Sequence, residues 1–136
     1  MGFVVDASVT MAWCFEDEVD TRAERALDRM RTERAFVPVV WPLEVANVLI
    51  VGERRGRLTA AQSTGFLTLL RSLPITVDTV PAENVWEALM DLARSHQLSS
   101  YDASYLELAR RLALPLVTGD GRLRNAAGMA GVVLLE

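Results

Sequence analysis

The chain has 136 residues, of which 51% are hydrophobic and 24% charged, with a formal net charge of −4. This length and composition predict one globular domain, residues 1–136, with a sizeable core. All fourteen basic residues are arginine, which excludes the lysine-dependent classes: Schiff-base enzymes, P-loop NTPases and receiver domains. The acidic balance also argues against a protein that coats nucleic acid without sequence preference.

The single cysteine, Cys14, excludes an internal disulfide and a cysteine-cluster metal site, and we expect it to be a small buried hydrophobe rather than a reactive thiol. The first residues carry Asp6 and no basic residue before Arg22, unlike a signal peptide. The apolar stretch 36–52 is interrupted by prolines and by Glu44, so it does not resemble a membrane span. These features predict a cytoplasmic protein that does not enter a membrane.

Predicted strands and helices alternate along the chain. The strands are expected at 3–5, 35–40, 75–77, 116–118 and 132–135. The helices are expected from an N-cap at Ser8 to about 15, from 20 or 21 to 34, from 43 to 55, from a capping box at 59–62 to 73, after Pro81, from 99 or 100 to 112, and after Asp120, with a turn at Glu16–Glu18.

We expect helix 43–55 to be buried nearly all round, and Tyr105, Leu108, Ala109 and Leu112 to face inward from the helix that ends at 112. The alternation predicts a three-layer α/β/α sandwich with a mainly parallel central sheet. In such sheets ligands bind beyond the carboxyl ends of the strands.

Two carboxylates follow predicted strands at that edge. Asp6 closes the first strand, and Asp120 follows strand 116–118. Either residue alone is as well explained by a local turn or a helix cap. If the two strands are parallel, both carboxylates open onto the same edge of the sheet, and this coincidence favours a functional reading of both.

Two further carboxylates lie on predicted helices. Glu44 belongs to an apolar helix, with Asn47 three residues on and therefore on the same face. A buried ionised carboxylate needs a positive partner, which is either an arginine or a metal ion. Asp102 lies in the first turn of its helix, where an acidic residue also suits the helix dipole.

Together the four acids form an oxygen-only set that favours Mg²⁺ or Mn²⁺ over zinc. The single histidine, His96, is expected to be structural or exposed. Hard divalent ions held by carboxylates assist the hydrolysis of phosphate esters, which is the reaction class that these residue types predict.

Four motifs in order make the chain resemble the PIN-domain family, and more narrowly the VapC-type toxins of type II toxin–antitoxin systems. The motifs, which place the resemblance over residues 1 to about 135, are Val4-Val5-Asp6-Ala7-Ser8, Glu44-Val45-Ala46-Asn47, Tyr101-Asp102-Ala103-Ser104-Tyr105-Leu106-Glu107-Leu108-Ala109 and Thr118-Gly119-Asp120-Gly121-Arg122-Leu123. The family's acidic quartet falls on Asp6, Glu44, Asp102 and Asp120, and its supporting polar positions fall on Ser8, Asn47 and Thr118.

The resemblance implies a Mg²⁺- or Mn²⁺-dependent endoribonuclease that cleaves RNA and is neutralised by a cognate antitoxin. It also implies a homodimer and a contact with DNA only through the antitoxin. Gly119 stands where many relatives carry a larger residue, and we expect it to loosen the loop that bears Asp120. Some of the large apolar residues should line a partner groove or a dimer face: Trp13, Phe15, Trp41 and Trp86.

Arginines follow two of the acids and are candidates for contact with RNA phosphates: Arg54, Arg55, Arg57, Arg122 and Arg124. For each of them a solvated surface position is an equal alternative. The alternative function is a non-catalytic PIN fold that binds RNA or serves assembly, against which the complete quartet argues. A haloacid-dehalogenase-like phosphatase would need a second aspartate where Ser8 stands and a lysine. A relative of the flap endonucleases would need more chain than 136 residues.

Overall fold

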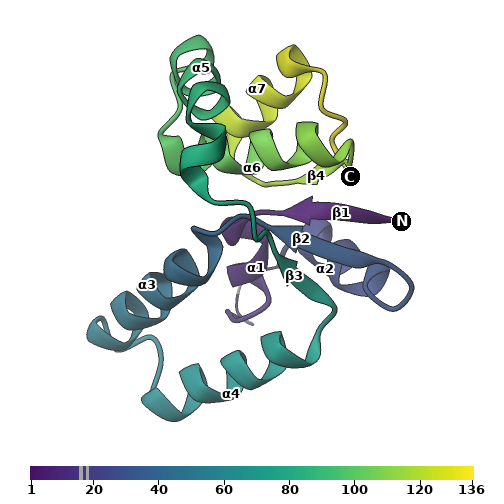
Figure 1. The fold of residues 1–136 in the computed structure, drawn as a ribbon. Helices are drawn as coiled ribbons and strands as arrows, with labels where there is room; N and C mark the ends of the chain where they lie inside the picture. The colour runs from purple at the N-terminus through teal and green to yellow at the C-terminus, as the bar shows by residue number, and fades with distance from the viewer. Residues whose placement is uncertain (16, 18) are drawn as a thin grey trace.

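Four parallel strands form the central sheet of the molecule (Figure 1). The computed structural model describes residues 1–15, 17 and 19–136, so most of the turn expected at Glu16–Glu18 lies outside the described residues. The sheet order is β3-β2-β1-β4, and every pair within it is parallel. The predicted mainly parallel sheet is therefore confirmed. The strands are β1 (Gly2–Val5), β2 (Arg34–Val37), β3 (Ile75–Val77) and β4 (Leu116–Val117).

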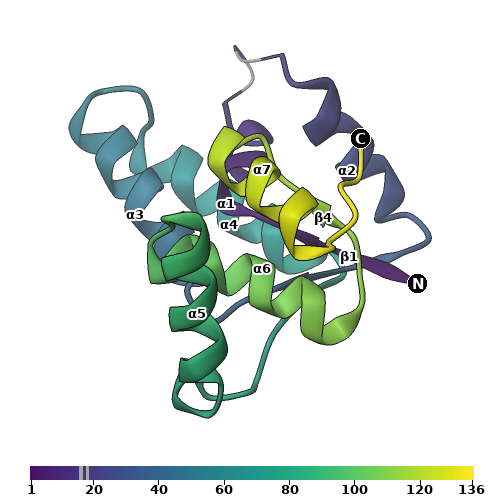
Figure 2. The ribbon, with the colours of Figure 1, turned by 90° about the horizontal axis from the view of Figure 1, so that it is seen from above.

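Helices cover both faces of the sheet, as expected for a three-layer sandwich (Figures 1 and 2). On one face lie α1 (Ala7–Ala12), α2 (Thr21–Arg29), α3 (Trp41–Arg54) and α4 (Ala60–Ser72). A 3₁₀ turn, η1 (Ala82–Val85), leads to the helices of the other face, which are α5 (Trp86–His96), α6 (Ser100–Leu112) and α7 (Gly121–Ala130). Helix α6 packs on β1, β4 and both of its neighbouring helices.

Strand β1 is the most deeply buried part of the sheet. All four of its residues are buried, and it pairs with β2 on one side and β4 on the other. Val4 lies opposite both Phe36 and Leu116, and Val5 lies opposite Val117. This register brings the carboxyl ends of β1 and β4 together, so the residues that follow them emerge side by side.

Several predicted boundaries are corrected by local chemistry. Asp6, rather than Ser8, is the N-cap of α1, because its carboxylate accepts a hydrogen bond from the backbone N–H of Val9. Strand β2 ends before Pro38, which cannot donate to the ladder. The expected last strand at 132–135 is reduced to a single parallel bridge between Leu116 and Leu134.

The capping predictions for the later helices are confirmed. Thr59 and Gln62 form the reciprocal capping box of α4, Ser99 caps α6, and Asp120 caps α7. Helix α2 is shorter than expected and ends at Arg29, with Met30 as its C-cap.

The prediction that helix α3 is buried nearly all round is wrong. Trp41, Val45 and Leu49 face the core, whereas Leu43 is 72% exposed and Ile50 is 42% exposed. Leu112 of α6 is also partly exposed, contrary to expectation. Cys14 is half-buried and packs against the core. Among the described residues, no helix is long and apolar enough to cross a membrane.

Candidate active site

Asp6 is a buried carboxylate at the end of the central strand. Its residue is 5% exposed, and both of its oxygens lie within hydrogen-bond distance of the Ser8 hydroxyl, at 2.8 and 2.9 Å. The N–H of Val9 donates to Oδ1 at 3.0 Å, and the hydroxyl of Thr118 donates to Oδ2. Among the described residues, the hydrogen bonds that Asp6 receives thus come from neutral donors.

Thr118 connects Asp6 to Asp120. Its fully buried hydroxyl donates to Asp6 and accepts from the backbone N–H of Asp120 at 3.0 Å. Asp120 then caps α7 by accepting from the N–H of Leu123 at 3.0 Å, while the residue itself stays exposed. The parallel pairing of β1 and β4 thus places both carboxylates at the same edge, as the sequence predicted.

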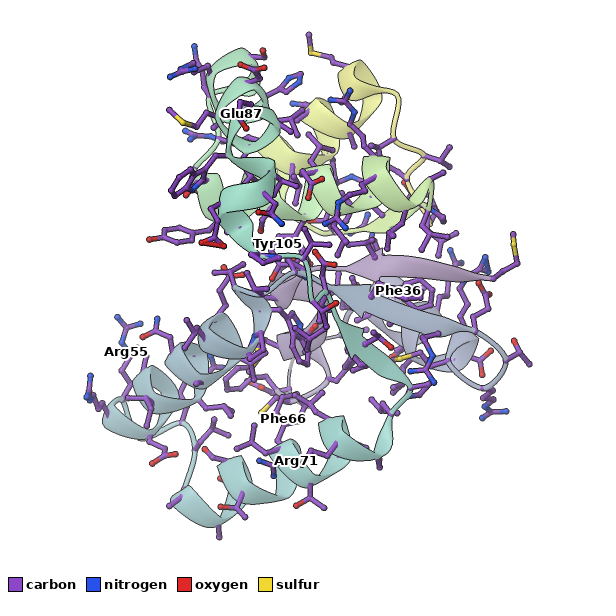
Figure 3. The ribbon with its side chains drawn as sticks, viewed as in Figure 1. Phe36, Arg55, Phe66, Arg71, Glu87 and Tyr105 are labelled. Atoms are coloured by element: carbon purple, nitrogen blue, oxygen red, sulfur yellow. The ribbon has the colours of Figure 1, made fainter. Side chains whose placement is uncertain are left out.

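Glu44 approaches this edge from α3, which lies on the opposite face of the sheet from α7. It lies in the first turn of α3 and is half-buried, and its Oε1 accepts from the hydroxyl of Tyr105 at 2.6 Å. Tyr105 lies on α6, between that helix and the sheet (Figure 3). Tyr105 faces inward as its sequence pattern predicted, but its hydrogen bond to Glu44 was not expected. Its spacing of three residues from Asp102 on one helix was the available signal.

Asp102 lies in the first turn of α6. Its backbone N–H donates to the capping hydroxyl of Ser99 at 3.1 Å, and its side chain is half-buried. The carboxylate accordingly sits where the N-terminal end of the helix favours negative charge.

The four carboxylates lie within electrostatic reach of one another. Burial is the largest cause that raises the pKa of Asp6, and the charge of Asp120 adds to it. Burial also raises the pKa of Glu44, partly opposed by the Tyr105 hydroxyl, with further contributions from Asp102 and Asp6. Burial and then Asp120 raise the pKa of Asp102, while Ser99 and Arg122 act in the opposite sense. Each acid of the quartet therefore repels two others, in the order Asp6, Asp120, Asp102, Glu44 and back to Asp6.

Within the described part of the chain, Arg122 offsets only part of this repulsion, at Asp102. Among the described residues, no arginine forms a salt bridge with any of the four acids. An uncompensated set of oxygen donors suits a hard divalent cation chemically. The side chains do not form a ready coordination sphere, however: within the described ranges, no three His, Cys, Asp or Glu side chains gather closely enough to hold a metal ion.

The three supporting residues are placed differently. Ser8 and Thr118 contact Asp6 directly. Asn47 lies one turn after Glu44 on α3 but is exposed. Among the described hydrogen bonds, none joins Asn47 to one of the four acids. Of the candidate arginines, Arg124 donates to the backbone carbonyl of Thr118 at 3.1 Å, and Arg57 stacks on Phe15 away from the quartet.

One residue beside the site was not singled out from the sequence. Arg22 of α2 lies next to Gly119, since a Cβ built on Gly119 would be 3.6 Å from Arg22 Nη1 and 3.8 Å from Ser8 Oγ. No local motif marks Arg22, because its position beside Gly119 depends on how α2 packs in the folded protein.

Comparison with known proteins agrees with this architecture. A family model described as the PIN domain matches residues 3–129. Ribonuclease VapC9 of Mycobacterium tuberculosis is 35% identical over 122 residues, which cover 90% of this chain and 88% of that protein. Ribonuclease VapC3 of Pyrobaculum aerophilum is 30% identical over 123 residues, which cover 90% of this chain and 92% of that protein.

Two solved structures share the fold. PAE2754 from Pyrobaculum aerophilum has a TM-score of 0.69 at 24% identity and covers 93% of this chain and 84% of its own. A toxin–antitoxin complex from Klebsiella pneumoniae contains a chain with a TM-score of 0.63 at 17% identity, covering 96% of this chain and 95% of its own. The match over nearly the whole length, joined to the parallel sheet with its acidic edge, shows that this chain belongs to the PIN-domain family and, within it, to the VapC group.

Proposed function

We propose that the protein is a Mg²⁺- or Mn²⁺-dependent endoribonuclease that acts as the toxin of a toxin–antitoxin pair. The observation that carries this proposal is the quartet of mutually repelling carboxylates, with which no arginine forms a salt bridge in the described part of the chain. The relatives named ribonuclease VapC support RNA as the substrate.

In this proposal Asp6, Glu44, Asp102 and Asp120 hold the divalent cation. When bound, the cation supplies Lewis-acid charge for the hydrolysis of a phosphodiester. Ser8 and Thr118 fix the orientation of the Asp6 carboxylate, and the Tyr105 hydroxyl fixes that of Glu44. Asn47 would act less directly, because it is exposed and no described hydrogen bond joins it to the acids.

The proposal extends to partners. The neighbour solved as a toxin–antitoxin complex supports a cognate antitoxin as inhibitor, through which alone the protein would meet DNA. A homodimer would cover apolar surface, for which Trp86, 59% exposed, and Leu43 are suited. Trp41 and Phe15, which the sequence also offered for a partner face, are instead buried in the core. We expect the protein to act in the cytoplasm, where its RNA substrate is found.

The test is cleavage of single-stranded and structured RNA by the purified protein, followed on denaturing gels. Mg²⁺ or Mn²⁺ should support cleavage, EDTA should stop it, and replacing the ion should restore it. The Asp102→Asn variant, purified in parallel, controls for contaminating nucleases because its purification is identical. Cleavage that survives chelation, requires zinc or persists in Asp102→Asn would overturn the proposed catalytic function. RNA binding without cleavage in any divalent ion would favour the non-catalytic PIN module.

A further inference from the structure

Two arginines and one glutamate meet beside the acidic quartet. Arg22 comes from α2 on one face of the sheet, and Arg124 comes from α7 on the other. Both reach Glu136: Arg22 Nη2 lies 3.6 Å from Oε2, and Arg124 Nη2 bonds Oε1. The cluster adjoins the end of β4, because Arg124 also holds the carbonyl of Thr118 and Arg22 flanks Gly119.

Arg22 is the unsatisfied member of this cluster. A guanidinium carries five N–H donors, yet the partner that Arg22 has among the described residues is Glu136, and its closest contact is long, at 3.6 Å. Its Nε is buried without an acceptor, although the side chain as a whole is 28% exposed. A buried donor without a partner is costly. An arginine in this state, with part of its guanidinium open to solvent, has unused capacity to bind an anion.

Glu136 is a weakly held partner for these arginines. Its side chain is 57% exposed, and solvent screening weakens ion pairs between exposed groups. The pKa of Glu136 lies below its ordinary value, chiefly because Arg124 donates a hydrogen bond to it. Its carboxylate thus stays ionised at neutral pH and presents two oxygens to two guanidinium groups, as a phosphodiester would.

The RNA backbone needs such a contact here. A polyanion that approaches four carboxylates is repelled, and the protein as a whole carries a net charge of −4. The paired arginines lie on the Asp6 and Asp120 side of the quartet, since Gly119 stands between Thr118 and Asp120 and borders on Ser8.

We propose that Arg22 and Arg124 form a subsite for a backbone phosphate of the RNA next to the cleaved bond, and that Glu136 occupies this subsite until the phosphate displaces it. The inference rests on the proposed ribonuclease function and adds where the substrate is held.

Gly119 has a role in this subsite. It does not adopt a positive φ, so the backbone does not require glycine, and a Cβ would only touch Arg22 and Ser8 at ordinary contact distances. Side chains longer than alanine would crowd Arg22 and Ser8 further. The loop is also held by the Thr118 and Arg124 hydrogen bonds, so glycine here opens an approach to Arg22 rather than loosening the loop.

The test measures RNA binding rather than cleavage. A labelled single-stranded RNA oligonucleotide is titrated with each protein in EDTA, where cleavage is absent, and fluorescence anisotropy gives Kd at several salt concentrations. Arg22→Ala is compared with Arg25→Ala, which removes the same charge from an exposed position on the same helix. Glu136→Gln is the second variant, and thermal unfolding checks that each one folds.

Arg22→Ala should raise Kd about tenfold, the loss of roughly one charge-assisted hydrogen bond, whereas Arg25→Ala should raise it less than about twofold. The salt dependence of log K should fall by about 0.7 in Arg22→Ala, the value for one phosphate contact on a single strand. Glu136→Gln should lower Kd, because it releases both arginines.

Equal effects of Arg22→Ala and Arg25→Ala, or weaker binding by Glu136→Gln, would overturn the subsite. So would a wild-type protein that cleaves RNA with a KM unchanged by Arg22→Ala, and in that case the proposed ribonuclease function would stand. Binding that depends on Arg22, without cleavage in Mg²⁺ or Mn²⁺, would instead overturn the catalytic function and keep the subsite.

Discussion

Two buried carboxylates of this protein, Asp6 and Glu107, have opposite surroundings. They are 5% and 7% exposed, and their elements, β1 and α6, pack against each other. Glu107 receives Arg111 through Nε at 2.8 Å and Nη2 at 3.0 Å, and the same guanidinium binds Asp78 at 2.6 Å. The Asp6 carboxylate accepts hydrogen bonds from two hydroxyls and one backbone N–H, and among the described residues no arginine contacts it.

Under the proposed function, this difference distinguishes an acid that stabilises the fold, Glu107, from one that binds a ligand, Asp6. The charge of Glu107 is balanced by Arg111 within α6, and the same arginine joins α6 to Asp78 in the segment that follows β3. The charge of Asp6 is left unbalanced beside three other acids, which raises its pKa together with burial. Uncompensated buried charges of this kind are typical of sites where a ligand of opposite charge binds.

The largest effect is expected from Asp6→Asn. It should lower RNA cleavage about 100-fold or more, because changes that only surround a metal ligand already cost 10–100-fold. At neutral pH it should also raise Tm, because a buried ionised group is removed. The amide oxygen can still accept from the Val9 N–H and the Ser8 hydroxyl, and its NH2 group can donate to the Thr118 hydroxyl oxygen. Cleavage assays and thermal unfolding in EDTA measure the two effects.

Asn47→Ala is the comparison variant for cleavage, with an expected loss of less than about tenfold, the lower end of the range for residues outside the ligand set. A larger loss in Asn47→Ala than in Asp6→Asn would contradict the assignment of Asp6 as a ligand. A lower Tm for Asp6→Asn than for wild type would contradict the inference that the ionised Asp6 carboxylate destabilises the folded protein.

The second largest effect is expected on stability, from the loss of the arginine that pairs with Glu107. Arg111→Ala should lower the free energy of unfolding by about 2–3 kcal/mol, somewhat less than for a fully buried pair because the arginine is partly exposed, and Tm should fall by roughly 10 °C. Urea unfolding measures it. Arg110→Ala, the exposed neighbour on α6, is the matched control and should change stability by less than about 0.5 kcal/mol. Equal losses in both variants would show that the Glu107 pair is not the stabilising contact.

The smallest effect is a pH dependence at Glu44. Its pKa in the folded protein lies above the ordinary 4.5, so the folded state holds this proton to higher pH than the unfolded chain does. The associated stability is present at low pH and is lost as the pH rises through the folded pKa. The Glu44→Gln variant does not lose this stability. The difference between its Tm and that of wild type should therefore grow by a few degrees from pH 4 to pH 7, in favour of the variant.

Thermal unfolding of both proteins in EDTA across this range tests the expectation. Added Mg²⁺ should then stabilise wild type more than Glu44→Gln and reduce the difference. A difference that does not vary with pH would contradict an unbalanced charge at Glu44.

Much of the site's location followed from the sequence because it depends on strand ends. Asp6 and Asp120 come directly after short apolar runs, and parallel pairing places such residues at one edge whatever the details of packing. The layers also followed from alternation, and the caps at Thr59 and Ser99 followed from local side-chain chemistry.

The failures have a common cause in tertiary packing. Helix α3 is apolar around most of its circumference, so its pattern did not show which side would stay exposed at Leu43 and Ile50. The contact between Tyr105 and Glu44 joins residues 61 positions apart. Arg22 likewise reaches the site through the packing of α2, which no spacing in the chain reveals.

The position of Asp6 at the end of β1 has a consequence for how activity can be switched. Strand β1 lies inside the sheet with every residue buried, and such segments open to hydrogen exchange only when the whole domain unfolds. Local fraying therefore cannot displace Asp6 while the rest of the fold persists. A molecule that inhibits this site in the folded protein must therefore bind over it from outside. When that molecule dissociates, Asp6 is accessible again without any refolding.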